Sequence, residues 1–112
     1  MEITVKQLNQ TSVVSMMGSL DALTADEVTR FLSAQIGSGQ KQIVADLSQV
    51  DFVSSAGLRA ILAALKESRQ QGGDLRIAAA QPGVEKILKM SGFTSILKDY
   101  PTVDEAVTSF GS

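Results

Sequence analysis

The stretch Ile43-Val44-Ala45-Asp46-Leu47-Ser48-Gln49-Val50-Asp51-Phe52-Val53-Ser54-Ser55-Ala56-Gly57-Leu58 joins an apolar run to the start of a helical pattern. The unbroken run at 43–45 is typical of a strand that is buried on both faces. From Ala56 onward apolar residues recur at helical spacing, at Leu58, Ile61, Leu62 and Leu65. The stretch therefore predicts a strand, a loop and a helix N-terminus, with hydroxyl side chains where the first helical N–H groups point outward.

Two adjacent serines stand at this predicted junction, although a helix needs only one N-cap. Ser54 and Ser55 suit the role equally, and neither completes a capping box, because Gly57 and Leu58 occupy the positions three residues further on. One serine is therefore spare, next to a glycine that permits close approach. An exposed hydroxyl here suits phosphorylation, since a helix N-terminus tolerates the nearly two negative charges that a phosphate adds.

The N-terminal third of the chain predicts a hairpin and a helix. Residues 2–8 alternate as a half-buried strand, and residues 12–17 form a second strand that pairs antiparallel with the first and ends at Gly18-Ser19-Leu20-Asp21. Thr24 and Glu27 fit a capping box, and Leu23 and Val28 fit a hydrophobic staple. The helix stops at Gly37-Ser38-Gly39.

The remaining chain alternates strands and helices. A strand at 41–47, the helix from Ala56 and a strand at 74–80 form a right-handed crossover, so these two strands should be parallel. A third helix opens at Pro82, a short edge strand lies within 93–97, and a second capping box at Thr102–Glu105 opens a terminal helix that buries Val107 and Phe110. Residues 1–112 are expected to form a single α/β domain, with a mixed sheet of four or five strands and about four helices against it.

Composition excludes several function classes. The chain has 112 residues, 10 basic and 12 acidic side chains, a formal charge of −2, and neither cysteine nor histidine. This balance argues against a nucleic-acid surface that contacts phosphates, and the missing residues exclude common zinc sites and histidine-based catalysis.

We expect no direct membrane insertion and a cytoplasmic location, because no apolar run is long enough to span a bilayer and no secretory signal is seen.

The chain also offers no recognisable catalytic motif. It lacks a phosphate-binding loop and a nucleophile elbow, which counts against a nucleotide-binding or nucleotide-hydrolysing domain, and no cofactor is expected. Asp21, Asp46 and Asp51 are the candidates for a magnesium site near the serines. Aspartates at strand ends more often serve turns, and we favour that interpretation over metal binding. The sequence therefore does not predict an enzyme.

Four segments together resemble one family. They are Asp46–Leu58, Gly18-Ser19-Leu20-Asp21 with Thr24, Gly72-Gly73 before Leu75-Arg76-Ile77, and Met90-Ser91-Gly92-Phe93. They are similar to the STAS domain of sulphate transporters and bacterial anti-sigma factor antagonists, over essentially the whole chain. A free-standing chain of this length resembles the antagonists most.

This resemblance implies a function as a protein-interaction switch. Family antagonists bind an anti-sigma factor that is also a serine kinase, and binding releases a sigma factor. The kinase uses ATP to phosphorylate and inactivate the antagonist, and a PP2C-type phosphatase restores it. The family's phosphorylated serine lies two residues before the glycine, which here is Ser55, with Ser54 as the alternative. The usual pattern has Asp where this chain has Ser54, and often Ser where it has Ala56.

The partner-binding residues implied by the resemblance surround the same junction. They are Asp21, Thr24, Ser54, Ser55, Ala56, Gly57, Leu58 and Arg59. Other family members are constitutive cytoplasmic subunits of lipid-transport ATPase complexes. In that alternative Ser55 is only a helix cap, and the same helix packs on an ATPase.

Overall fold

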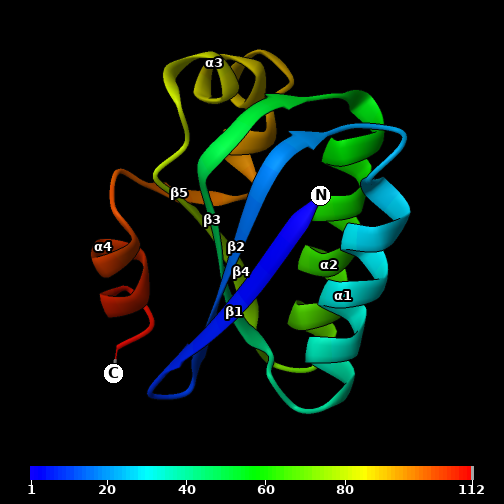
Figure 1. Ribbon diagram of the computed structural model, residues 1–112. Helices are drawn as coiled ribbons and strands as arrows, with labels where there is room; N and C mark the ends of the chain where they lie inside the picture. Colours follow the sequence, from blue (N-terminus) through cyan, green and yellow to red (C-terminus); the bar gives the residue numbers. More distant parts are fainter. Residues whose placement is uncertain (112) are drawn as a thin grey trace.

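The computed structural model describes residues 1–111 as a five-stranded mixed sheet with helices on both faces (Figure 1). The strands lie in the order β1 (Glu2–Leu8), β2 (Thr11–Leu20), β3 (Gln42–Val53), β4 (Asp74–Ala78) and β5 (Lys98–Tyr100). The β1–β2 pair is antiparallel, and the other three pairs are parallel. The predicted hairpin, the parallel crossover and the mixed sheet are thus confirmed.

The helices divide between the two faces of the sheet. They are α1 (Ala25–Gly37), α2 (Ser55–Gln70), α3 (Pro82–Met90) and α4 (Val103–Thr108), with a short 3-10 turn η1 (Phe93–Ser95) before β5. Figure 1 shows α1 and α2 side by side on one face and α4 on the other. No helix within residues 1–111 is both long and apolar enough to cross a membrane.

The main core lies between the sheet and helices α1, α2 and α3. It is almost entirely aliphatic, as expected for a chain with 4% aromatic residues. Leu20, Ile43 and Ile61 are fully buried in it. Burying one such side chain contributes about 1.5–3 kcal/mol. A smaller apolar cluster lies under α4, formed by Val13, Val44, Ala78, Ala106 and Val107.

Strands β2 and β3 are longer than the sequence pattern predicts. We expected them to end at Met17 and Leu47, but they run to Leu20 and Val53. Their last residues pair in parallel, Leu20 with Val53, after register shifts between Ser15 and Met17 and between Gly18 and Ser19. These irregularities break the strict alternation by which a strand is recognised from sequence. Strand β4 is shorter than expected and ends at Ala78 rather than Ala80.

The expected start of α1 is right, but its expected capping contacts are wrong. The Thr24 hydroxyl makes no cap hydrogen bond. It donates instead to the carbonyl of Ser19 at 2.8 Å and accepts from the Asp21 N–H at 3.0 Å. The predicted staple also fails, because Leu23 is 93% exposed while Val28 is buried. The second cap is confirmed, since the Thr102 hydroxyl accepts from the Glu105 N–H at 3.1 Å.

The chain enters α2 through a close contact with the end of β2. The Ser54 N–H donates to the carbonyl of Leu20 at 2.9 Å, and Gly57 packs directly on Leu20. A Cβ atom on Gly57 would overlap the Leu20 carbonyl oxygen and lie 2.7 Å from its Cγ. Only glycine therefore allows the first turn of α2 to sit this close to β2.

Replacing Gly57 with alanine should destabilise the fold, because the added methyl meets backbone atoms that cannot move aside. We expect Gly57→Ala to lower the free energy of unfolding by about 3 kcal/mol, measured by urea denaturation. Gly83, in the first turn of α3, is the matched control, since a Cβ there meets nothing within 4 Å. Gly83→Ala should leave stability unchanged or raise it by up to about 1 kcal/mol. Equal losses for the two variants would contradict the close-contact explanation.

Candidate functional site

The structure gives the two adjacent serines different roles. Ser54 is the N-cap of α2, and its hydroxyl oxygen accepts from the Gly57 N–H at 3.3 Å. Ser55 is the first residue of the helix and is exposed. Within residues 1–111 its hydroxyl has no hydrogen-bond partner. Ser55 is therefore the spare serine.

A tight turn holds Asp21 beside this junction. The Asp21 carboxylate accepts from the Leu23 N–H at 3.0 Å, and its carbonyl oxygen accepts from Ala25 N–H at 2.8 Å. Thr24 closes the turn through its bonds to Ser19 and Asp21. The Leu23 side chain of this turn points into solvent.

A shallow groove of about 270 Å³ runs between the first turns of α1 and α2, next to the serines. Its walls are mostly small side chains, with one charged residue from each helix. They are Ala22, Ala25, Asp26, Thr29, Ala56, Arg59 and Ala60. We call Asp21, Leu23, Asp26, Ser55 and Arg59, which surround this groove and junction, the junction surface.

Some residues expected to bind a partner are buried in this structure. Leu58 is only 8% exposed and belongs to the main core, and Gly57 is buried against Leu20. They position the junction and do not present side chains at its surface. Thr24 is half-buried with its hydroxyl used by the turn. Of the expected residues, Ser55 and Arg59 are the ones that lie exposed on the helix.

Two exposed apolar residues near the junction received no binding role from the sequence. Leu23 was assigned to a staple, and Phe52 to the strand–loop stretch. In the structure Leu23 is 93% exposed and Phe52 is 48% exposed. Phe52 pairs with Ser19 on β2, so it lies close to the turn that carries Asp21. A periodicity argument assigns such residues to the core by default, and only the tertiary structure shows that they are exposed.

The three aspartates considered for a magnesium site are engaged separately. Asp46 accepts from the Ser15 hydroxyl at 2.9 Å and Asp51 from the Ser19 hydroxyl at 2.8 Å. Asp21 accepts from its own turn. Over the described part of the chain, no three acidic residues gather in a way that could hold a metal ion. In this structure each of them ties a strand or a turn to its neighbours.

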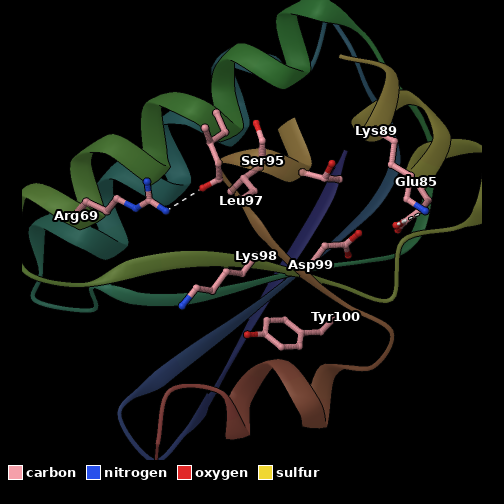
Figure 2. A pocket seen from close by; sticks show the side chains of 10 residues that line it. Arg69, Glu85, Lys89, Ser95, Leu97, Lys98, Asp99 and Tyr100 are labelled. Atoms are coloured by element: carbon pink, nitrogen blue, oxygen red, sulfur yellow. Dashed lines mark hydrogen bonds and ion pairs between the residues drawn. The ribbon is translucent and has the colours of Figure 1, made fainter. Parts of the chain in front are cut away.

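A wider hollow of about 580 Å³ lies away from the serines, between the end of α2, α3 and the segment that enters β5. Figure 2 shows the charged side chains around it. Arg69 bonds to Asp74 and to the Ile96 carbonyl, and Lys89 lies 3.6 Å from Glu85. Burial and the neighbouring Glu85 raise the pKa of Asp99 to about 6, although Lys89 acts in the opposite direction. The ionised, half-buried carboxylate of Asp99 in this hollow therefore destabilises the fold at neutral pH.

Replacing Ser54 should cost stability, whereas replacing Ser55 should not, because only Ser54 caps the helix. We expect Ser54→Ala to lower the free energy of unfolding by about 1 kcal/mol. The matched change Ser55→Ala should stay within about 0.5 kcal/mol of wild type. Denaturant titration of both variants measures the difference. A larger loss from Ser55→Ala would show that the roles are reversed.

The raised pKa of Asp99 predicts a pH dependence of stability. The pKa of Asp99 is about 6 in the folded state, compared with the ordinary value of 3.8, so the folded protein binds this proton more tightly. The stability that proton binding contributes is therefore full below pH 3.8 and is lost as the pH rises through about 6. Asp99→Asn should therefore be at least as stable as wild type at pH 7, with wild type gaining on it toward pH 4. Carboxyl NMR measures the pKa directly, and Glu85→Gln should lower it. An Asp99 pKa near 3.8 in wild type would refute this.

Comparison with known proteins identifies similar chains. The model of the STAS domain family matches residues 2–106. BtrV of Bordetella bronchiseptica is 30% identical over 110 residues, covering 98% of this chain and 95% of BtrV. The anti-sigma F factor antagonist of Paenibacillus polymyxa is 33% identical over 97 residues, covering 86% of this chain and 83% of the relative.

Solved structures share the fold. An anti-sigma factor antagonist from Mycobacterium paratuberculosis superposes with a TM-score of 0.90 at 27% identity, covering 99% of this chain and 94% of that one. Unphosphorylated SpoIIAA, also described as an anti-sigma factor antagonist, gives a TM-score of 0.82 at 22% identity, covering 97% and 96%. The Bacillus SpoIIAA structure has also been solved in a phosphorylated form.

Proposed function

Because this chain belongs to the STAS domain family, we propose that its 112 residues form one STAS domain that works as an anti-sigma factor antagonist, switched by phosphorylation of Ser55. The assignment of the site to Ser55 is supported by the different roles of the two serines. Ser54 is used by the helix cap, whereas Ser55 is exposed with its hydroxyl uncommitted. Relatives that cover most of the chain are named as antagonists of anti-sigma factors.

The unmodified protein binds its anti-sigma factor through the junction surface. Leu23 supplies exposed apolar area, and Asp21 and Arg59 supply charges for orientation. The protein is a binding partner and a substrate rather than a catalyst. Its work belongs in the cytoplasm, where sigma factors act.

We take the anti-sigma factor to be also the kinase. The Ser55 Oγ attacks the γ-phosphorus of ATP, the bond from that phosphorus to the ADP oxygen breaks, and the hydroxyl proton passes to a base on the kinase. The product carries about −1.5 to −2 added charges at Ser55. A PP2C-type phosphatase reverses the change when water displaces Ser55 Oγ and inorganic phosphate leaves.

The added charge weakens binding because it falls inside the contact area. A phosphate at Ser55 must be desolvated or accommodated by the partner, and both cost free energy. The same charge leaves the fold intact, since the first turn of α2 contains no acidic residue that would repel it. Binding and folding therefore respond differently to one modification.

Incubation with the cognate anti-sigma kinase and ATP should place one phosphate on Ser55. Mass spectrometry of proteolytic fragments maps it, and Ser55→Ala should abolish labelling while Ser54→Ala retains it. In a binding assay, Ser55→Asp should bind the anti-sigma factor about tenfold or more weakly than Ser55→Ala, which corresponds to about 1.4 kcal/mol.

Two results would count against the proposal. Phosphate confined to Ser54 would reject the site assignment. Equal affinities of Ser55→Asp and Ser55→Ala would reject charge at this position as the switch, provided that both variants unfold at the same denaturant concentration as wild type.

A further inference from the structure

Arg59 stands on the junction surface and forms no ion pair with any residue between positions 1 and 111. It is exposed on α2, and it lines the groove that Asp26 lines from α1. The ion pairs found among residues 1–111 involve other cations, namely the N-terminus, Arg69, Arg76 and Lys89. Its guanidinium group is therefore available to an anion that arrives at this surface.

Ser55 and Arg59 are four residues apart on one helix, so their side chains are neighbours on the same face. Side chains on a helix lean toward its N-terminus, so a residue covers the turn that precedes it. Arg59 therefore covers the turn that begins at Ser55. No acidic residue of the first turn of α2 competes for it.

We infer that Arg59 captures the phosphate of phosphorylated Ser55, so that modification also neutralises the positive charge of the junction surface. This inference rests on the proposed function. The charge order is favourable, because an anion four residues N-terminal to a cation is the stabilising arrangement in a helix. Arginine also presents two parallel N–H donors that match a phosphate group.

Because Arg59 captures the phosphate, phosphorylation has two effects on the binding of a partner. Before modification Arg59 is the one cation of the junction surface, alongside Asp21 and Asp26. After modification its charge is neutralised by the phosphate, and the surface carries only negative charge. A partner carboxylate that pairs with Arg59 then loses its partner and faces an anion, which lowers affinity beyond the effect of added bulk.

The pairing can be measured without a kinase or a partner. Phosphoserine is introduced at position 55 during translation, and the second ionisation of the phosphate is followed by phosphorus NMR. The wild-type midpoint should lie about 0.3–0.7 pH below that of Arg59→Gln, because a nearby cation favours the dianion. Arg59→Lys should fall between them.

Arg30 is the matched control, since it is an exposed arginine on the neighbouring helix α1. Arg30→Gln should leave the phosphate midpoint at the wild-type value. The same midpoint in wild type and Arg59→Gln would overturn the capture, whatever kinase assays find. Conversely, a kinase that ignores Ser55 would reject the proposed function but leave the midpoint difference intact.

A binding experiment tests the consequence. Affinity for the anti-sigma factor is measured for wild type and Arg59→Gln, each with serine and with phosphoserine at position 55. Phosphorylation should reduce the affinity of wild type by a larger factor than the affinity of Arg59→Gln, and the two factors should differ by about threefold or more. The reason is that the variant has no positive charge at position 59 for the phosphate to neutralise. Equal factors in the two backgrounds would overturn the role of Arg59 in partner release.

Discussion

The junction depends on one close contact, between Gly57 at the start of α2 and Leu20 at the end of β2. This contact sets the distance between helix and sheet, and the Ser54 N–H bond to the Leu20 carbonyl fixes the direction in which the chain turns. With that direction fixed, Ser54 faces the first helical turn and Ser55 faces solvent. A side chain at position 57 would push the helix away from β2 and remove the basis for this division.

The same contact brings two distant segments to one surface. The turn that follows Leu20 carries Asp21 and Leu23, and the turn that follows Ser54 carries Ser55 and Arg59. Because Leu20 pairs with Val53, these turns leave the sheet from adjacent strands at the same edge. The proposed phosphate acceptor Ser55, the exposed side chain of Leu23 and the cation of Arg59 therefore all belong to one small area.

Charged side chains are kept out of the main core. The main core is almost purely aliphatic. Asp46 and Asp51 accept hydrogen bonds from hydroxyls of β2, and Asp21 accepts one from an N–H of its own turn. Asp99 differs because it is half-buried beside Glu85, which raises its pKa. That carboxyl lines the hollow between α2, α3 and β5 and not the groove beside Ser55, so it affects stability without belonging to the proposed switch.

The sequence by itself determined the elements whose signals are local. Apolar periodicity gave the helices and the parallel crossover, the Thr102 cap was recognisable from its spacing, and the segments around Ser55 identified the family. Only the tertiary structure decided which serine caps α2, how far β2 and β3 extend, and that Leu23 points outward. The first two of these features depend on contacts between residues more than thirty positions apart, such as Leu20 with Val53 and Gly57. A pattern within one segment cannot report a hydrogen bond or a close approach that another segment supplies.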